Sequence, residues 1–383
     1  MGMLVKVGKH TQPSFLHSIE DKIAPSERGL EAKEILNVTE RGTGKVKRID
    51  LEAHFTTKEI VQALYERKDY PRYADDPGTK NRRLWYTADT GEPIGDPLLN
   101  KLLDLEEDRL KSMDAAGIDV QCLSLTTPGV ERLDAPAGAA LARSSNDLLA
   151  KAVRKHPDRF VGFATLAPQD PKGAAYELER AVKDHGFKGW KTNSNYGDSY
   201  LDDKKYWPIL EKAEKLNAFI FLHPTVPAIP QLRTYGYALG GPSFGFGIET
   251  AICMMRLIYS GVFDKYPGLR VILGHLGEVL PFLMTRIDFV YERPWIDPAT
   301  RPNLVKRPSD YLRENVYVTT SGNYFKGAFL CTYEALGIDR ILLSVDYPYE
   351  DADACIRFIE GLPISQGERE KIYYQNAQRI GIV

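Results

Sequence analysis

Short apolar runs alternate with longer amphipathic stretches along most of this chain. The runs are rich in Val, Ile, Leu and Phe, which is typical of buried strands, and they predict strands at 47–53, 119–125, 159–166, 187–193, 218–224, 270–275, 316–320 and 340–345. The stretches between them repeat apolar residues every three or four positions, and several end in glycine. They predict helices at 98–117, 139–156, 174–186, 206–217, 248–263, 277–292, 326–337 and about 351–362.

This strand-then-helix order predicts an α/β protein with one TIM-like (β/α)8 barrel. A doubly wound open sheet is the alternative. Such sheets usually carry a glycine-rich phosphate loop after the first strand, and none follows residue 53. The barrel is therefore the favoured fold, and we assign it residues 46–383.

Two segments lack a periodic pattern. Residues 1–45 are polar and predict an irregular N-terminal extension that wraps the domain or a neighbouring subunit. Residues 69–96, rich in Pro, Gly, Arg and Asp, predict an irregular loop inserted after the first strand. A loop of that length in a compact domain is usually a lid or a binding loop.

Composition narrows the class of protein. The 383 residues are 43% hydrophobic and carry a net charge of −2, which gives no electrostatic reason to expect nucleic acid or an anionic membrane as a partner. There is no run of 18 apolar residues and no apolar signal-peptide core at the N-terminus. The four cysteines are far apart in apolar runs and predict reduced core residues. We therefore expect a cytoplasmic enzyme.

The ionisable residues at the predicted strand ends are the strongest sign of chemistry. Of the seven histidines, His54, His223 and His275 each end a strand, whereas His10, His17, His156 and His185 fall where surface residues are expected. Acidic residues join them at two strand ends, Glu52 in RIDLEAHF and Asp346 in SVDYP.

Each of these residues alone has an ordinary explanation as a hydrogen-bonded strand end, a buried ion pair or a helix cap. Together they would converge on the axis of a barrel, and burying them as a group is costly unless a cation compensates the charge. Mixed nitrogen and oxygen donors suit zinc, manganese or iron. The pattern therefore indicates a site for a divalent metal ion.

The same pattern resembles the amidohydrolase superfamily, whose metal ligands leave strands one, five, six and eight. That superfamily usually opens with His-x-His, whereas this chain reads Glu52-Ala53-His54. The variant looks like the branch of non-oxidative aromatic-acid decarboxylases, which includes γ-resorcylate, 2,3-dihydroxybenzoate and 5-carboxyvanillate decarboxylases. The resemblance covers about residues 47–380 and extends to LEEDRLKSMDAAGID, TTPGV, FVGFATLAPQDP, FGFGIET, FDKYPGLRVILGHLGE and SVDYPYE.

The resemblance implies one divalent ion, Mn2+ or Zn2+, and no organic cofactor. Its implied ligands are Glu52, His54, His223 and Asp346, although 5-carboxyvanillate decarboxylases lack a histidine at the place of His54. His275 and Glu278, in GHLGE, match a catalytic pair beside the metal.

The implied reaction is the release of CO2 and a phenol from an ortho-hydroxy aromatic acid. The aryl carbanion is avoided when Asp346 protonates the ring carbon first, and His275 accepts or relays the proton of the phenol.

Further residues are predicted to contact the substrate. Arg286 matches an arginine of the family that reaches the site region, and the others are Arg83, Tyr324, Phe325 and Asn193. Loop packing or a solvent-exposed salt bridge is the competing explanation for each. The aromatic and glycine-rich run 234–247 predicts part of the pocket rim.

Two other functions fit the same pattern. The barrel and its metal could hydrolyse an amide, a lactone or a carbon–carbon bond, although Glu52 in place of histidine favours the decarboxylase. Alternatively, the barrel could be catalytically silent with a structural metal. The expected partner of the decarboxylase is a small aromatic acid. Neither nucleic acid nor a membrane is expected as a partner, and the family suggests a homodimer or homotetramer.

Overall fold

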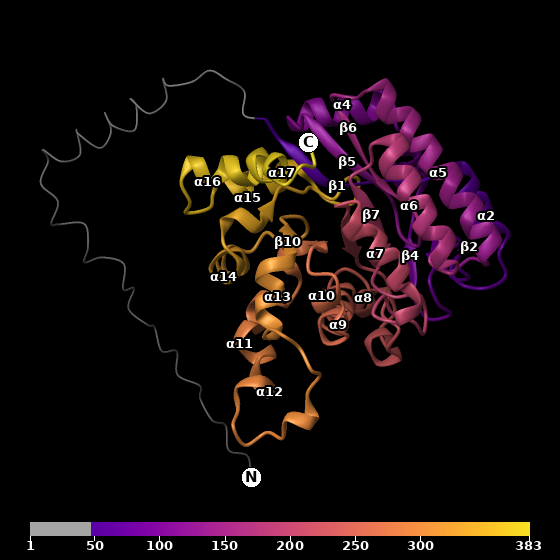
Figure 1. The fold of residues 1–383 in the computed structure, drawn as a ribbon. Helices are drawn as coiled ribbons and strands as arrows, with labels where there is room; N and C mark the ends of the chain where they lie inside the picture. The colour runs from indigo at the N-terminus through magenta and orange to yellow at the C-terminus, as the bar shows by residue number, and fades with distance from the viewer. Residues whose placement is uncertain (1–46) are drawn as a thin grey trace, which may run out of the picture. The chain divides into compact units, whose positions relative to one another are not determined.

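Eight short parallel strands form the centre of the fold in the computed structural model (Figure 1). The structure describes residues 47–383, so the predicted extension at 1–45 lies outside the described residues. The strands pair in chain order and confirm all eight predicted strands: β1 (Ile49–Phe55), β5 (Val120–Leu125), β6 (Phe160–Ala164), β7 (Gly189–Asn193), β8 (Phe219–His223), β9 (Arg270–Leu273), β10 (Val316–Thr319) and β11 (Ile341–Leu342).

The first and last strands meet and close the sheet. The amide of Leu51 donates a hydrogen bond to the carbonyl of Leu343 over 2.9 Å, and the amide of His54 donates to Tyr347 over 2.7 Å. Ala53 and Tyr347 also form a parallel bridge. The predicted (β/α)8 barrel is therefore confirmed, and the carboxyl ends of its strands face one mouth.

The barrel interior is filled by apolar side chains. Leu51, Cys122, Phe163 and Phe221 pack there with the C-terminal residues 377–382, near the end where several strands begin. Since apolar residues close that end, the polar residues at the strand ends are left at the opposite mouth. Trp190 of β7 is fully buried as well.

The helices alternate with the strands around the barrel, as Figure 1 shows. They are α2 (Lys58–Glu66), α3 (Asp96–Leu103), α4 (Glu107–Ala116), α5 (Ala135–Lys155), α6 (Pro171–His185), α7 (Trp207–Lys215), α8 (Tyr237–Gly240), α9 (Gly245–Tyr259), α10 (Val262–Lys265), α11 (Met284–Ile287), α12 (Phe289–Glu292), α13 (Pro308–Asn315), α14 (Lys326–Leu336), α15 (Ala352–Glu360), α16 (Gln366–Glu370) and α17 (Asn376–Arg379).

Three predicted helices are interrupted. The stretch 98–117 splits into α3 and α4 because the Asp104 carboxylate accepts hydrogen bonds from the amides of Glu106 and Arg109. The stretch 248–263 breaks at Gly261, which has a φ of +76°. The stretch 277–292 forms only short turns, since Glu278 also has a positive φ and Pro281 starts a 3-10 turn.

The segment 69–96 is not an irregular loop, as the sequence predicted. It forms a three-stranded antiparallel sheet of β2 (Arg72–Asp75), β3 (Arg82–Trp85) and β4 (Gly91–Pro93). Its strands are too short for the alternation of apolar and polar residues to show in the sequence.

Asp50 makes the stability of the barrel depend on pH. The side chain is fully buried in β1, where it accepts hydrogen bonds from the amides of Glu52 and Val345 and from Gln121. Burial raises the pKa of Asp50 to about 8 from 3.8. The folded state therefore holds a proton that the unfolded state has released between these values, and stability falls as the pH rises through this window.

We expect Asp50→Asn to remove this dependence, because an amide keeps the same acceptor and carries no charge. Between pH 5 and pH 7.5 the wild type should lose about 3 kcal/mol more unfolding free energy than the variant, at about 1.4 kcal/mol per pH unit. Urea denaturation at the two pH values, with chelator present, measures the difference. Equal losses in both proteins would contradict the assignment.

Candidate metal centre

Four side chains from distant parts of the chain meet at the barrel mouth. Glu52 and His54 come from β1, His223 ends β8, and Asp346 follows β11. Each offers one ligand atom, and these atoms all lie within 4.8 Å of one another. The structure thus brings together the four predicted metal ligands.

The β1 backbone is irregular where it delivers its two ligands. The register of β1 against β5 shifts between Asp50 and Ala53, and such a bulge re-aims the side chains beside it. Asp346 has a φ of +52°, a strained conformation for a residue with a side chain. Strain of this kind is concentrated at functional sites.

The Glu52 carboxylate is half satisfied by the protein. Its Oε2 atom accepts hydrogen bonds from the hydroxyls of Ser321 (2.6 Å), Ser344 (3.1 Å) and Thr319 (3.2 Å). Its Oε1 atom is buried, has no hydrogen-bond donor, and lies 3.5 Å from His223 Nε2. Burial raises the pKa of Glu52, and the nearby Asp346 adds to the rise. A cation at Oε1 would offset both costs.

The two histidines present nitrogen atoms to the same point. Nδ1 of His223 lies 2.8 Å from the carbonyl of Pro224, so it carries the proton and leaves the Nε2 lone pair free. Nε2 of His54 is 3.2 Å from His223 Nε2 and 3.0 Å from Asp346 Oδ1. Burial holds the pKa of His223 well below its usual range, which suits a neutral ligand. The donor set therefore fits a divalent metal ion.

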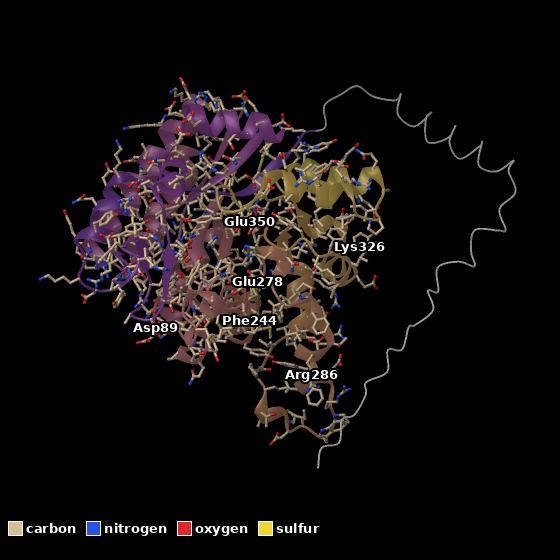
Figure 2. All side chains as sticks on the ribbon, turned by 180° about the vertical axis from the view of Figure 1, so that it is seen from behind. Asp89, Phe244, Glu278, Arg286, Lys326 and Glu350 are labelled. Atoms are coloured by element: carbon tan, nitrogen blue, oxygen red, sulfur yellow. The ribbon has the colours of Figure 1, made fainter. Side chains whose placement is uncertain are left out.

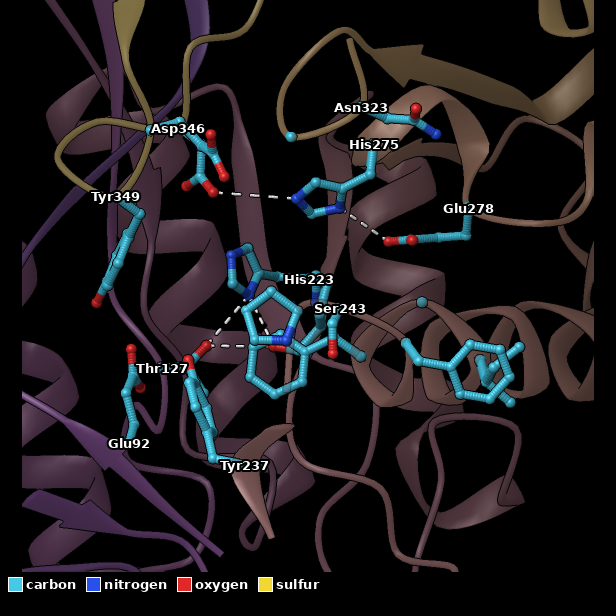
Figure 3. A pocket seen from close by; sticks show the side chains of 18 of the residues that line it. Glu92, Thr127, His223, Tyr237, Ser243, His275, Glu278, Asn323, Asp346 and Tyr349 are labelled. Atoms are coloured by element: carbon cyan, nitrogen blue, oxygen red, sulfur yellow. Dashed lines mark hydrogen bonds and ion pairs between the residues drawn. The ribbon is translucent and has the colours of Figure 1, made fainter. Parts of the chain in front are cut away.

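A second polar pair faces the pocket beside these ligands. Nδ1 of His275 lies 2.9 Å from Glu278 Oε1, and its Nε2 lies 3.9 Å from Asp346 Oδ2 (Figure 3). Burial alone would lower the pKa of His275, but Glu278, Asp346 and Glu52 together raise it well above the ordinary value. Burial likewise opposes ionisation of Asp346, yet His275 and His54 hold its pKa well below the usual range.

Glycine is needed beside this pair. A Cβ atom on Gly322, which has a φ of +68°, would lie 2.7 Å from the His275 ring. The loop after β10 therefore approaches His275 more closely than any other residue type would allow.

A cavity of about 680 Å3 opens over the metal ligands. His223, Asp346, His275 and Glu278 line one part of it. Aromatic and polar residues from the inserted sheet, the run 234–247 and the loop after Asp346 line the rest, among them Tyr86, Glu92, Tyr237, Phe244, Phe246 and Tyr349. Its volume is in the range of small-molecule sites and has room for an aromatic acid.

The predicted substrate contacts lie elsewhere in this chain. Arg83 bonds Asp76 (2.8 Å) and the carbonyl of Gly91 (3.1 Å), and so ties the small sheet together. Arg286 is exposed and stacks its guanidinium on Phe289, 4.9 Å from the ring centre (Figure 2 shows its place).

Two of the other contacts also miss the pocket by a short distance. Tyr324 packs its ring on Phe358, and Phe325 is 69% exposed, whereas their neighbours Gly322 and Asn323 line the cavity. One or two residues of offset in a loop reverse which side chain faces inward.

Asn193 instead supports the ligand His223. Its Oδ1 accepts hydrogen bonds from Lys191 Nζ (3.0 Å) and Thr127 Oγ1 (3.2 Å). Thr127 Oγ1 in turn lies 3.1 Å from His223 Nδ1. Burial lowers the pKa of Lys191 to about 8, against the opposing pull of Glu131. Lys191 and Thr127 thus lie behind His223, and the sequence pattern had indicated no role for either.

The remaining histidines and the cysteines agree only in part with expectation. His10 and His17 lie outside the described residues. His185 is half-buried at the end of α6, where it lies beside Asp147 and Arg180. Cys122, Cys253 and Cys355 are buried, Cys331 is half-buried, and all four are free thiols.

Comparison with known proteins places the chain in a family. The sequence profile of the amidohydrolase family matches residues 49–380. The chain belongs to the amidohydrolase family.

Relatives within it are similar over nearly their whole length. A γ-resorcylate decarboxylase from Polaromonas sp. is 38% identical over 345 residues, which is 87% of this chain and 98% of the relative. The crystal structure of a 5-carboxyvanillate decarboxylase from Sphingomonas paucimobilis has a TM-score of 0.78 at 34% identity, covering 88% of this chain and 98% of its own.

A further structure carries a metal. A dihydroxybenzoic acid decarboxylase from Polaromonas sp., with bound manganese and the inhibitor 2-nitroresorcinol, has a TM-score of 0.74 at 37% identity. It covers 87% of this chain and 96% of its own. The fold and the family predicted from strand-end residues are thus confirmed.

Proposed function

We propose that this enzyme removes CO2 from an ortho-hydroxy aromatic carboxylic acid of the hydroxybenzoate type in a metal-dependent, non-oxidative reaction. The observation that carries the proposal is the shared cavity: the carboxyl–imidazole pair of Asp346 and His275 opens, together with ligand His223, onto a space lined by aromatic rings. Relatives similar over nearly all of this amidohydrolase barrel are decarboxylases of such acids.

The proposed metal ligands are Glu52, His54, His223 and Asp346. When bound, a divalent ion supplies positive charge that favours the ionised phenol and holds the carboxylate. We propose manganese rather than zinc, since the set contains two carboxylates and two imidazoles and one related structure holds manganese. Metal analysis of the purified protein separates the two.

The residues of the chain move the protons. Nε2 of His275 faces the cavity while Glu278 holds its Nδ1, so this imidazole can exchange a proton between the phenol and Asp346. The Asp346 carboxyl then delivers the proton to the ring carbon that bears the carboxylate. The carbon–carbon bond breaks as its electron pair restores the aromatic ring and CO2 leaves. No electron is gained or lost, so we propose that no organic cofactor takes part.

Incubation with ortho-hydroxy benzoic acids and Mn2+ tests this function. We expect CO2 and the matching phenol in equal amounts, and no product after chelation. Turnover of esters, amides or lactones without release of CO2 would favour the hydrolase alternative instead.

Glu278 is expected to set the protonation of His275. Glu278→Gln removes the carboxylate that raises the pKa of His275, so that pKa should fall and the pH–rate limb assigned to His275 should move to lower pH. Loss of such a supporting group typically costs about 10- to 100-fold in activity. A pH profile of kcat measures both effects. An unchanged profile with lower activity would mean that Glu278 acts only on packing.

We also propose a cellular setting and an oligomeric state. Within the described residues no helix is both long and apolar enough to cross a membrane. The four free thiols suit a reducing compartment, and we propose the cytoplasm. Exposed Phe282, Trp295 and Val305 support the proposal of a homodimer or homotetramer, which light scattering would test.

A further inference from the structure

A second polar cluster lies in the same cavity, away from the metal ligands. Glu92, on β4 of the inserted sheet, is only 7% exposed. Its Oε2 accepts a hydrogen bond from the Tyr86 hydroxyl over 2.7 Å, and the Tyr237 hydroxyl also interacts with this carboxylate. All three residues line the cavity. We call Glu92, Tyr86 and Tyr237 the Glu92 subsite.

The Glu92 carboxylate has no cation beside it. Among residues 47–383 it forms no ion pair with a lysine, arginine or histidine, and no lysine or arginine of these residues lines the cavity. Burial raises the pKa of Glu92, and hydrogen bonds from Tyr86 and Tyr237 oppose that rise. A carboxylate buried without a cation costs free energy. The fold does not require a carboxylate at position 92, since a neutral hydrogen-bond acceptor would serve the two tyrosines equally well.

Tyr349 relates the subsite to the reacting centre. Its ring packs on the ligand His54, with ring centroids 5.8 Å apart. Its hydroxyl lies 2.7 Å from Thr126 Oγ1. Burial and the charge of Glu92 raise the pKa of this hydroxyl. Figure 3 shows Glu92, Tyr237 and Tyr349 on one side of the pocket and His275 with Glu278 on the other. An aromatic acid bound beside Asp346 and His275 would share the cavity with the subsite, which could then contact its remaining ring positions.

We propose that the Glu92 subsite selects substrates by binding a hydrogen-bond-donating ring substituent, a hydroxyl or an amino group, in addition to the ortho-hydroxyl used in the reaction. This inference rests on the proposed function. A buried acceptor discriminates against an analogue that lacks the donor, because the acceptor is then left unpaired. A methoxy group has no donor, and a second carboxylate would be repelled by Glu92.

The test compares acids that differ only in the second substituent. The substrates are 2-hydroxybenzoate, the 2,3-, 2,4-, 2,5- and 2,6-dihydroxybenzoates, and the monomethyl ether of the best of these. The enzymes are the Mn2+-loaded wild type, Glu92→Gln, Glu92→Met and the control Asp89→Asn. Asp89 lies on the same hairpin and hydrogen-bonds Thr87, Thr90 and Arg233 outside the cavity.

The expected result is a substrate-dependent loss. Glu92→Met should lower kcat/KM for the best dihydroxybenzoate by about 10- to 100-fold, the range for hydrogen bonds to charged groups. Its kcat/KM for 2-hydroxybenzoate and for the methyl ether should change by less than about 3-fold. Glu92→Gln keeps one acceptor oxygen, so its kcat/KM for the best dihydroxybenzoate should lie between those of the wild type and Glu92→Met. Asp89→Asn should match the wild type. An equal loss on every acid would overturn the inference and leave Glu92 a packing role.

Calorimetry separates this inference from the proposed function. The dihydroxybenzoate should bind the wild type more tightly than its methyl ether does, and Glu92→Met should abolish the difference whether or not turnover occurs. Absence of CO2 from every acid, with this binding difference intact, would reject the proposed function and support the subsite. Release of CO2 without any binding difference would reject the subsite alone.

Discussion

Replacing Asp346 with asparagine is expected to lower CO2 release by at least about 1,000-fold, the largest effect of any single change considered. The side chain is proposed to act twice, as a metal ligand through Oδ1 and as the proton donor to the ring carbon. Proton transfer by a placed side chain contributes about 100- to 10,000-fold by itself. Asparagine has no acidic proton, while its amide oxygen still offers a weak ligand. Single-turnover measurement of CO2 at saturating Mn2+ gives the loss.

The two roles of Asp346 separate when metal content is measured on the same protein. A variant that keeps its metal and still fails to release CO2 supports the proton-donor role, and full loss of metal supports the ligand role. Asp353→Asn, an exposed aspartate at the start of α15, is the matched control and should retain activity. More than a tenth of wild-type turnover in the metal-loaded Asp346→Asn protein would contradict the mechanism.

The second large effect is expected from Glu52→Gln, which should abolish the gain in unfolding free energy that Mn2+ gives the wild type. Glu52 Oε2 is already bonded to three hydroxyls, so its buried Oε1 is the atom left for a metal. Without metal, Glu52 lies buried near the Asp346 carboxylate, and the amide relieves that repulsion. The metal-free variant should therefore be more stable than the metal-free wild type, yet should gain nothing from Mn2+.

Urea denaturation with and without Mn2+ measures this reversal. In the wild type, metal at 100 times its dissociation constant should add about 2.7 kcal/mol of unfolding free energy. In Glu52→Gln the addition should vanish together with activity. The same experiment tests the silent-barrel alternative, because chelation should abolish catalysis while the wild type stays folded. A wild type that unfolds on chelation would indicate a structural metal.

The barrel was predictable because its strands are buried on both faces. Runs such as AFIFL (218–222) and VIL (271–273) are short and apolar without interruption, as strands of a buried parallel sheet are. The order of strand and helix then leaves few topologies open. Helix ends were predicted less well, since they depend on single contacts: the Asp104 carboxylate divides α3 from α4, and nothing in 98–117 distinguishes it from an ordinary surface aspartate.

The metal ligands were predictable for a related reason. Residues at the ends of parallel strands meet at one mouth whatever the loops do, so strand positions predicted that Glu52, His54 and His223 lie close together, and the family resemblance implied their role as ligands. Glu92 could not be found in this way. It stands between glycine and proline in TGEPIG, and only the fold of the inserted sheet turns it into the cavity. The partners of Arg83, on β3, could not be predicted from the sequence either, because tertiary contacts determine them.

In the proposed enzyme, Glu52, His54, His223 and Asp346 bind one divalent ion on which decarboxylation depends. Diffraction from Mn2+-loaded crystals, recorded on both sides of the manganese absorption edge, locates that ion. We expect a single anomalous peak bonded to all four side chains and open toward the cavity beside His275. A peak elsewhere, or a mouth that stays free of metal in an enzyme that still releases CO2, would contradict it.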